Sequence, residues 1–382
     1  MSGGVTHVSG RDPGTGQTHT ITIRDGVISV IAAGGPDDGA WLSLGLFDLQ
    51  LNGFGGYDLN AGPDAQTVRD LAAAVHASGV SRFAPTLITA SRAALTDALR
   101  AIAEARDSDP LVKHAIPFVH VEGPHIAPED GPRGAHPAQH VRPPDLAEFD
   151  AWQAACGNLV GLVTLSPHWP ETSDYIRGLR ARGVHVALGH TNAASDAIAA
   201  AAEAGATLST HLGNGIAAVL PRHPNPIWTQ LAEDRLWASF IADGHHLPAE
   251  TFKAMLRAKT LDRAILVSDA VALAGAAPGI YDMPIGGRVE LKANGRLEVA
   301  GTPFLAGAAT SLVFDVATAR RMAGLTWADA LRLATVNPRK LFDLPALTVG
   351  APADLLRFHV GEDGALVPET VYVAGQPHPA KP

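Results

Sequence analysis

Apolar runs that each end on one polar side chain recur along the middle of the chain. Residues 117–121 lead to Glu122, and three later runs lead to His190, His211 and Asp269. These runs are almost wholly apolar rather than alternating, which is typical of parallel strands covered on both faces. The chemistry of a barrel of parallel strands takes place at the carboxyl ends of its strands. These four side chains are therefore the first candidates for a functional site.

Strand candidates of this kind alternate with alanine-rich segments that have helical spacing. Two of the predicted helices cover residues 68–75 and 196–202. Eight strands are predicted, at residues 44–51, 82–88, 116–122, 159–165, 184–190, 206–211, 237–243 and 264–269. Regular alternation of strand and helix predicts an α/β fold, a (β/α)8 TIM-type barrel. An open doubly wound sheet is the alternative, but no glycine-rich nucleotide loop follows the first strand.

The two chain ends carry a different pattern. Alternating runs on either side of Asp25-Gly26 predict a β-hairpin near the amino terminus. Strands are also predicted at residues 353–358 and 370–374, close to the carboxyl terminus. We therefore expect a small β-sandwich domain built from residues 1–43 and 345–382, with the barrel occupying residues 44–344.

One segment interrupts the alternation after the last barrel strand. Residues 283–292 and 295–299 predict a two-stranded excursion. Helical spacing then resumes at residues 311–323 and 327–336.

Composition narrows the class of protein further. Hydrophobic residues make up 46% of the 382 residues and charged residues 18%, which is enough for a sizeable core. The net charge of −9, without a basic stripe, argues against nucleic acid as a partner. The single cysteine excludes a disulfide framework within the chain. Neither a signal-peptide pattern nor a membrane-length apolar run is found, so we expect a cytoplasmic enzyme with no membrane partner.

A carboxylate and two histidines at strand ends suit a divalent transition metal with an open position for water. A single such residue is more often a hydrogen-bonded structural group. Three such residues on separate strand ends, together with Asp269 on the last strand, favour a metal site. Asp269 could also cap the segment that follows it, with Ser268.

Seven short motifs in a fixed order resemble those of the N-acetylglucosamine-6-phosphate deacetylases of the amidohydrolase superfamily. Their fold is a barrel with a β-domain assembled from the chain ends. The motifs lie at residues 50–53, 85–89, 120–124, 189–193, 210–214, 242–246 and 268–270.

The resemblance implies that Glu122, His190 and His211 bind one metal ion, with Zn²⁺ expected before Fe²⁺, Co²⁺ or Mn²⁺. Many amidohydrolases hold a second ion with a His-X-His motif on the first strand. Here the corresponding residues are Gln50 and Asn52, and uncharged amides are poor zinc ligands. We therefore expect a single metal ion in each subunit.

The resemblance also implies two catalytic residues. Asp269 would take a proton from the attacking water and pass it to the leaving amine, which is too basic to leave as an anion. His136, in Gly134-Ala135-His136-Pro137, would contact the acyl carbonyl and stabilise the oxyanion. His140 is the alternative for this second role, because it lies close by in the sequence.

For the sugar phosphate, the resemblance implies contacts from Asn214, Gly215, Arg222 and His246. Arg222 would reach the site of the neighbouring subunit in a homodimer, and its planar guanidinium suits phosphate oxygens. A solvated loop arginine is the alternative, since the surrounding segment is rich in proline. The role of His245 stays open.

The expected reaction is hydrolysis of N-acetyl-D-glucosamine 6-phosphate to glucosamine 6-phosphate and acetate. A different N-acyl substrate, such as a non-phosphorylated N-acetyl amino sugar, is the alternative enzyme function. A non-catalytic sugar-phosphate-binding protein would lack a ligand or the base, and none is missing. A dihydroorotase-like amidase would need the first-strand histidines and a lysine on the fourth strand, residues 159–165, which has none.

Overall fold

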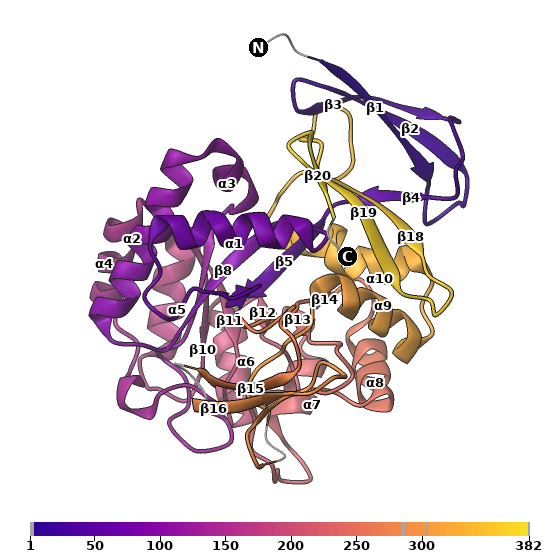
Figure 1. Ribbon diagram of the computed structural model, residues 1–382. Coiled ribbons are helices and arrows are strands. Elements are labelled where there is room, and N and C mark those ends of the chain that lie inside the picture. The colour runs from indigo at the N-terminus through magenta and orange to yellow at the C-terminus, as the bar shows by residue number, and fades with distance from the viewer. Residues whose placement is uncertain (1–3, 284–286, 303–304, 381–382) are drawn as a thin grey trace.

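Eight parallel strands form the centre of the computed structural model, which describes residues 4–283, 287–302 and 305–380 (Figure 1). They are β5 (Leu46–Leu51), β8 (Val80–Ile88), β9 (Val119–Glu122), β10 (Val160–Leu165), β11 (His185–Leu188), β12 (Leu208–Ser209), β13 (Trp237–Phe240) and β14 (Ala264–Leu266). The sheet closes because Leu51 pairs in parallel with Ala270, just beyond β14. The predicted barrel and the order of its strands are confirmed.

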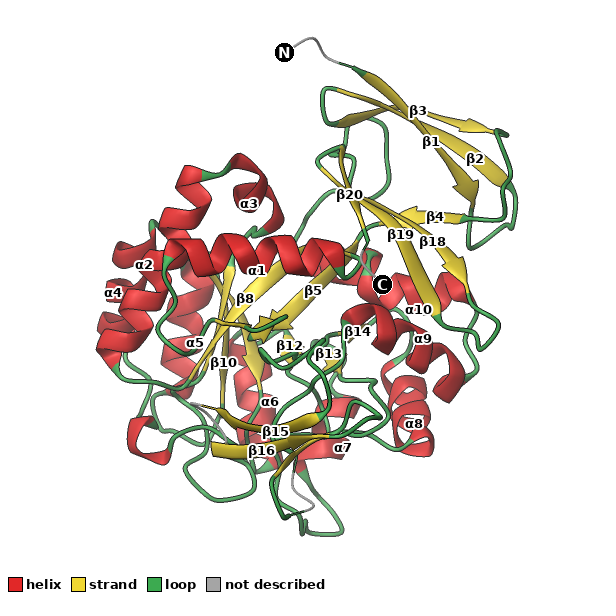
Figure 2. Ribbon diagram, viewed as in Figure 1, coloured by secondary structure: helices red, strands yellow, loops and turns green. Residues whose placement is uncertain are grey.

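Helices surround this barrel, as the red ribbons of Figure 2 show. They are α1 (Ala65–Ala77), α2 (Arg92–Ser108), α3 (Pro110–Ala115), α4 (Leu146–Cys156), α5 (Thr172–Ala181), α6 (Ser195–Ala204), α7 (Pro226–Ala232), α8 (Ala249–Lys259), α9 (Leu312–Ala323), α10 (Trp327–Ala334) and α11 (Val336–Leu341), with a 3₁₀ turn at Ala138–His140. Side chains of Asp64 and Ser91 accept hydrogen bonds from the first turns of α1 and α2, which fixes where these helices begin. The four predicted helices correspond to α1, α6, α9 and α10, although α9 begins one residue after the predicted position and α10 ends two residues before it.

The interior of the barrel changes from apolar to polar toward the carboxyl ends of the strands. Apolar side chains such as Phe47 and Leu162 fill the amino-terminal half. Next, His120 Nε2 lies 2.7 Å from Thr164 Oγ1, which lies 2.7 Å from Thr210 Oγ1. These buried polar atoms are hydrogen-bonded to one another, so they form a stable polar layer in the barrel below Glu122.

A seven-stranded sheet joins the two ends of the chain, and Figure 1 shows its indigo and yellow strands side by side. Its strands are β1 (Val5–Arg11), β2 (Thr18–Arg24), β3 (Val27–Ala33), β4 (Trp41–Leu44), β18 (Leu355–Val360), β19 (Leu366–Val373) and β20 (Gln376–Pro379). The sheet is curved, and the backbone N–H of Ile28 on the edge strand β3 donates to the carbonyl oxygen of Ala351. The curved sheet encloses a separate hydrophobic core. The hairpin at Asp25-Gly26 is confirmed, with φ of 52° and 80° at its turn. The exact domain boundaries stay a prediction.

A buried ion-pair network connects the chain-end sheet to the barrel. Asp354, immediately before β18, accepts a hydrogen bond from Arg82 Nε on β8 at 2.6 Å. Its other oxygen lies 2.7 Å from His114 Nε2 and accepts the N–H of Ala374 at 2.9 Å. Burial opposes ionisation of Asp354, but His114 and Arg82 outweigh it and lower the pKa of Asp354 to about 2.

We expect Asp354→Asn to lower the free energy of unfolding by about 3 kcal/mol, because it leaves Arg82 buried without a counter-charge. This stabilisation is complete above the unfolded-state pKa of about 4. It is lost as the pH falls toward the folded-state pKa of about 2. Urea unfolding at several pH values measures the effect. As a control, Asp37→Asn removes a surface partner of Arg11 and should leave the midpoint unchanged. Equal effects of the two substitutions would contradict this account.

A small three-stranded antiparallel sheet lies over the carboxyl ends of the barrel strands, at the lower side of Figure 1. It comprises β15 (Gly279–Met283), β16 (Gly287–Leu291) and β17 (Leu297–Val299), which we call the flap. The predicted excursion had two strands, at residues 283–292 and 295–299, which correspond to β16 and β17. Of β15, the prediction included only Met283. Residues 284–286 lie outside the described part. A second small hairpin, β6 (Gly53–Phe54) and β7 (Tyr57–Asp58), follows β5. Among the described residues, no helix is long and apolar enough to cross a membrane.

Candidate active site

A cavity of about 250 Å³ lies at the carboxyl ends of the barrel strands, beneath the flap. Every predicted site residue except Arg222 lines it, namely Glu122, His136, His190, His211, Asn214, Gly215, His246 and Asp269. The flap contributes apolar wall residues, including Met283 and Leu297. Predicted site residues separated by up to 147 positions in the sequence, from 122 to 269, therefore meet in one cavity.

The backbone turns sharply where three of the strands deliver their functional residues. The φ angles of His190, His211 and Asp269 are 48°, 28° and 52°, in the left-handed region that non-glycine residues seldom adopt. Such strain persists where the surrounding structure enforces it, and it clusters at functional sites. The conformation ends each strand at the residue that lines the cavity.

Three nitrogen atoms converge on one oxygen of Glu122. Its Oε1 lies 2.9 Å from His211 Nε2 and 3.2 Å from His190 Nε2, and it accepts a hydrogen bond from Gln50 Nε2 at 3.0 Å. Although burial opposes ionisation, the two imidazoles hold the pKa of Glu122 well below its usual range. Burial likewise opposes the charge on His211, but Glu122 outweighs it and raises the pKa of His211.

The contact between His190 and Glu122 indicates that a cation belongs here. His190 Nδ1 lies 2.9 Å from the carbonyl oxygen of Pro132, which can only accept, so Nδ1 carries the proton. Nε2 then faces a carboxylate oxygen, which can only accept. This contact is attractive only with a proton or a metal ion between the atoms. A backbone carbonyl on the far nitrogen is also the usual partner of a metal-binding histidine.

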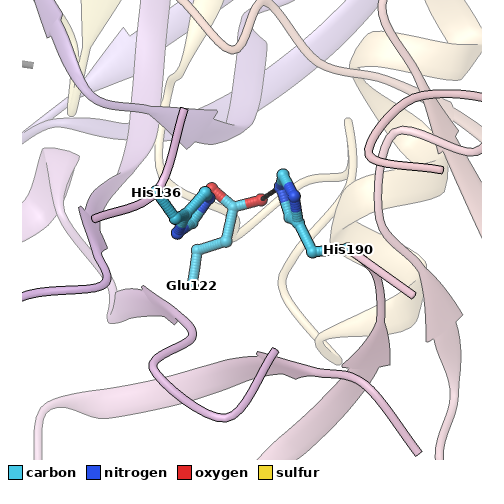
Figure 3. Close-up of side chains that lie close together, drawn as sticks. All are labelled: Glu122, His136 and His190. Atoms are coloured by element: carbon cyan, nitrogen blue, oxygen red, sulfur yellow. Dashed lines mark ion pairs between the residues drawn. The ribbon is translucent and has the colours of Figure 1, made fainter. Parts of the chain in front are cut away.

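The His190–Glu122 distance of 3.2 Å is close to that in a metal site, whereas the His211–Glu122 distance of 2.9 Å is that of a hydrogen bond. A tetrahedral zinc ion with bonds of about 2.0–2.2 Å holds its ligand atoms roughly 3.3–3.5 Å apart. Glu122, His136 and His190 offer ligand atoms that all lie within 4.8 Å of one another, and Figure 3 shows the carboxylate between the two rings. The residues present fit a divalent ion, with His136 and His211 both near it. The predicted ligand set of Glu122, His190 and His211 stays a prediction.

The two amides of the first strand have a role that the sequence interpretation missed. Gln50 donates to Glu122, and Asn52 Nδ2 donates to Asp269 Oδ1 at 2.8 Å. Each amide therefore orients one carboxylate of the site. Amides at positions where a second metal ion would need histidines were a signal for this, because an amide N–H is a donor suited to a carboxylate.

Asp269 has the environment of a proton-transfer group. Burial, followed by the negative charge of Glu122, raises the pKa of Asp269 to about 6. A carboxyl group tuned toward neutral pH can both accept and return a proton. Ser268 forms a separate contact, donating from Oγ to buried Asp48 at 2.5 Å. Asp269 faces the cavity, so capping by this pair does not account for its position.

The chain matches the amidohydrolase family over residues 41–377. It belongs to this family. A Bacillus subtilis relative, an N-acetylglucosamine-6-phosphate deacetylase, is 29% identical over 352 residues, which cover 88% of this chain and 87% of that protein. An Escherichia coli relative, an N-acetylgalactosamine-6-phosphate deacetylase, is 29% identical over 365 residues, or 94% of each chain.

Solved structures of the same family of deacetylases are also similar to this chain. A Mycobacterium smegmatis N-acetyl-D-glucosamine-6-phosphate deacetylase variant, in complex with N-acetyl-D-glucosamine 6-phosphate, superimposes with a TM-score of 0.85 at 28% identity. The match covers 95% of both chains. The resemblance inferred from the seven motifs is confirmed.

In this amidohydrolase, the two adjacent histidines after β13 have different surroundings. His246 lines the cavity, and its Nδ1 donates to Asp243 Oδ2 at 2.7 Å. Asp243 also accepts the backbone N–H groups of His245 and His246, at 2.8 and 2.9 Å. His245 Nε2 instead lies 3.0 Å from the carbonyl oxygen of Asn294 in the flap. Asp243 is a positioning residue, whereas the sequence indicated no role for it beyond its place in the motif at residues 242–246.

The structure also distinguishes His136 from His140. His136 is buried and lines the cavity, whereas His140 is half-buried in the 3₁₀ turn and does not line it. Burial, followed by the neighbouring His190, holds the pKa of His136 well below its usual range. The ring is therefore neutral at neutral pH.

Arg222 is the predicted site residue that lies outside the cavity of its own chain. It is exposed, in the proline-rich loop between β12 and α7. Among the described residues that line the cavity there is no lysine or arginine.

Proposed function

We propose that this amidohydrolase hydrolyses the N-acetyl amide of N-acetyl-D-glucosamine 6-phosphate, giving glucosamine 6-phosphate and acetate. The observation that carries the proposal is the convergence of Glu122, His190, His211 and Asp269 on one cavity. Relatives that cover most of the chain deacetylate phosphorylated N-acetylhexosamines. An amide whose leaving group is an amine needs a carbonyl activator and a proton donor, and the cavity holds candidates for both.

The chain would hold one divalent metal ion through Glu122, His190 and His211. Imidazole and carboxylate ligands favour Zn²⁺, and Fe²⁺, Co²⁺ and Mn²⁺ are the alternatives. When bound, such an ion supplies an activated water and polarises the amide carbonyl. Gln50 holds the carboxylate of Glu122 in place, and the carbonyl of Pro132 orients His190.

The side chains around this position have complementary roles. Asp269, oriented by Asn52, accepts the proton of the attacking water and then donates it to the nitrogen of the leaving amine. His136 donates a hydrogen bond to the oxygen of the scissile carbonyl and stabilises the charge that develops there. The apolar flap residues Met283 and Leu297 exclude bulk water, which strengthens both interactions.

The phosphate would be bound by Asn214, Gly215 and His246 of one chain and by Arg222 of a second copy. The cavity lining, within the described residues, lacks a lysine or arginine of its own, so a dianionic phosphate needs a cation from outside. Val219 and Trp228, close to Arg222 in the sequence, are 87% and 56% exposed, and a second copy on this loop would cover apolar surface. We therefore propose a homodimer in which Arg222 enters the partner's site.

Arg222→Ala should raise KM for the phosphorylated sugar about 10- to 100-fold, with little change in kcat, because a charge-assisted contact to phosphate is lost. Activity on the free sugar should stay unchanged. Steady-state kinetics on both substrates provides the measurement. As a control, Arg177→Ala removes an exposed arginine that pairs with Asp174 on α5, and it should have no effect. An equal KM for Arg222→Ala and wild type would refute the phosphate role.

The proposed reaction is tested by assaying acetate release from the 6-phosphates of N-acetylglucosamine and N-acetylgalactosamine, and from both free sugars. Metal content should be measured on the same sample. We expect the highest kcat/KM on N-acetylglucosamine 6-phosphate. A preference for the galactose epimer would instead place this chain with the Escherichia coli relative. Equal activity on free and phosphorylated sugars would favour the alternative function, a non-phosphorylated N-acetyl substrate.

A further inference from the structure

Thr89, immediately after β8, is the partner of His136 on the side of the ring away from the cavity. The hydroxyl Oγ1 of Thr89 lies 2.8 Å from His136 Nδ1. The backbone N–H of the same residue points at Nδ1 from 3.4 Å. Thr89 is 1% exposed and His136 4%, so water does not compete for these contacts.

These two contacts determine which nitrogen of His136 carries the proton. A backbone N–H is always a donor, so an Nδ1 that faces it must be an acceptor. The Thr89 hydroxyl then donates to the same nitrogen. In a neutral imidazole the other nitrogen holds the proton, which places an N–H at Nε2. Nε2 is the ring nitrogen left for the cavity that His136 lines.

His190 has the opposite arrangement, although its ring centroid is only 4.2 Å from that of His136. Its Nδ1 carries a proton because it faces the carbonyl oxygen of Pro132, so Nε2, which faces Glu122, is the nitrogen available to a metal ion. Two adjacent rings are thus held in opposite tautomers by opposite backbone partners. One presents a donor to the cavity, and the other presents a metal ligand.

We infer that Thr89 is a positioning residue that holds His136 in the Nε2–H form, so that His136 donates to the substrate carbonyl and does not bind the metal ion. The kinetic consequence of this inference rests on the proposed function, but the tautomer itself does not. Wrong-tautomer variants of catalytic histidines lose large factors in kcat although their geometry is preserved.

The loop that carries His136 is held by other contacts, so Thr89 can be changed without releasing it. Arg133 donates to the carbonyl oxygen of His136 at 2.9 Å. Arg142 donates to the carbonyl oxygen of Ala90 at 2.9 Å and pairs with the buried carboxylate of Glu148 at 2.5 Å. Removing the Thr89 hydroxyl therefore alters the donor to Nδ1 while these anchors remain.

The tautomers can be observed in long-range ¹H–¹⁵N spectra of ¹⁵N-histidine-labelled protein loaded with Zn²⁺, which is diamagnetic. His136→Asn and His190→Asn variants assign the two rings. We expect an Nε2–H pattern for His136 and an Nδ1–H pattern for His190 in the wild type. Thr89→Val removes the closer donor to Nδ1 and leaves only the backbone N–H at 3.4 Å, so it should raise the share of His136 in the Nδ1–H form and leave His190 unchanged. Thr89→Ser, which keeps the hydroxyl, should retain the wild-type pattern.

Kinetics and metal content complete the test. Thr89→Val should lower kcat about 10- to 100-fold, with KM and metal content close to wild type, because an oxyanion donor is misplaced. Thr89→Ser should restore kcat to within about threefold of the wild-type value. As a matched control, Thr86→Val removes another buried hydroxyl from β8 and should lower thermal stability without changing the His136 spectrum.

An Nδ1–H pattern for wild-type His136, or a Thr89→Val variant with an unchanged spectrum and kcat, would overturn the inference. Equal spectral changes in the Thr86 and Thr89 variants would also overturn it, since they would show a general structural effect. If the wild-type and variant spectra are as expected but no phosphorylated N-acetylhexosamine is deacetylated, the inference stands and the proposed function fails.

Discussion

Asp269→Asn is expected to lower kcat at least about 1,000-fold while the protein keeps its metal ion and its fold. Asparagine has nearly the same shape and can still hydrogen-bond to Asn52, but it cannot accept the proton of water or return one to the amine. The loss therefore falls on the chemical step, and KM should change little. Steady-state kinetics, with metal analysis of the same sample, provides the measurement.

Asp262→Asn is the matched control for this experiment. Asp262 is an exposed carboxylate before β14 that pairs with Arg332 on α10, and its replacement should leave kcat within about twofold. An Asp269→Asn variant with near-normal turnover would exclude Asp269 as the proton shuttle. Loss of both metal and turnover would instead place Asp269 among the metal ligands.

Glu122→Gln should abolish turnover by a different route. The substitution preserves the size of the side chain but removes the charge on which His211 and His190 converge at 2.9 and 3.2 Å. A divalent ion bound by two neutral imidazoles and a neutral amide is held much more weakly. We expect metal content below about one-tenth of an ion per chain and a fall in kcat of about 1,000-fold or more.

Two comparisons show whether this loss comes from the metal ion. Chelation of the wild type should reproduce the loss of activity, and added metal should reverse it; the Glu122→Gln variant should not recover. Metal removal should also lower the melting temperature of the wild type but not that of the variant, because only the wild type gains stability from binding. A metal-loaded, inactive Glu122→Gln protein would contradict a ligand role for Glu122.

Much of the fold could be predicted from patterns of local sequence. Apolar runs and alanine-rich segments located the barrel strands, because parallel strands covered on both faces need continuous apolar residues. Asp25-Gly26 located a hairpin, since its turn requires left-handed backbone at both positions. The first flap strand, β15, was missed because Gly279–Met283 is short and contains a glycine and an aspartate, which are depleted in strands.

Less of the candidate site than of the fold could be predicted from the sequence. Glu122 and Asp269 stood out because each follows an apolar run, and strand ends in a barrel share one edge. Gln50 was expected only to exclude a second metal ion, whereas the fold uses its amide to orient Glu122. The roles of Thr89 and Asp243 could not be predicted, since their hydrogen-bond partners depend on loop conformation.

The sequence by itself determined which side chains with suitable chemistry stand at the strand ends, because periodicity and strand termini are local properties of the chain. Tertiary structure alone decided what each of these groups can do. Whether a histidine is a ligand or a donor depends on what faces its second nitrogen: for His190 the carbonyl of Pro132, and for His136 the N–H and hydroxyl of Thr89. Those contacts join segments far apart in the sequence, so they exist only once the barrel has closed.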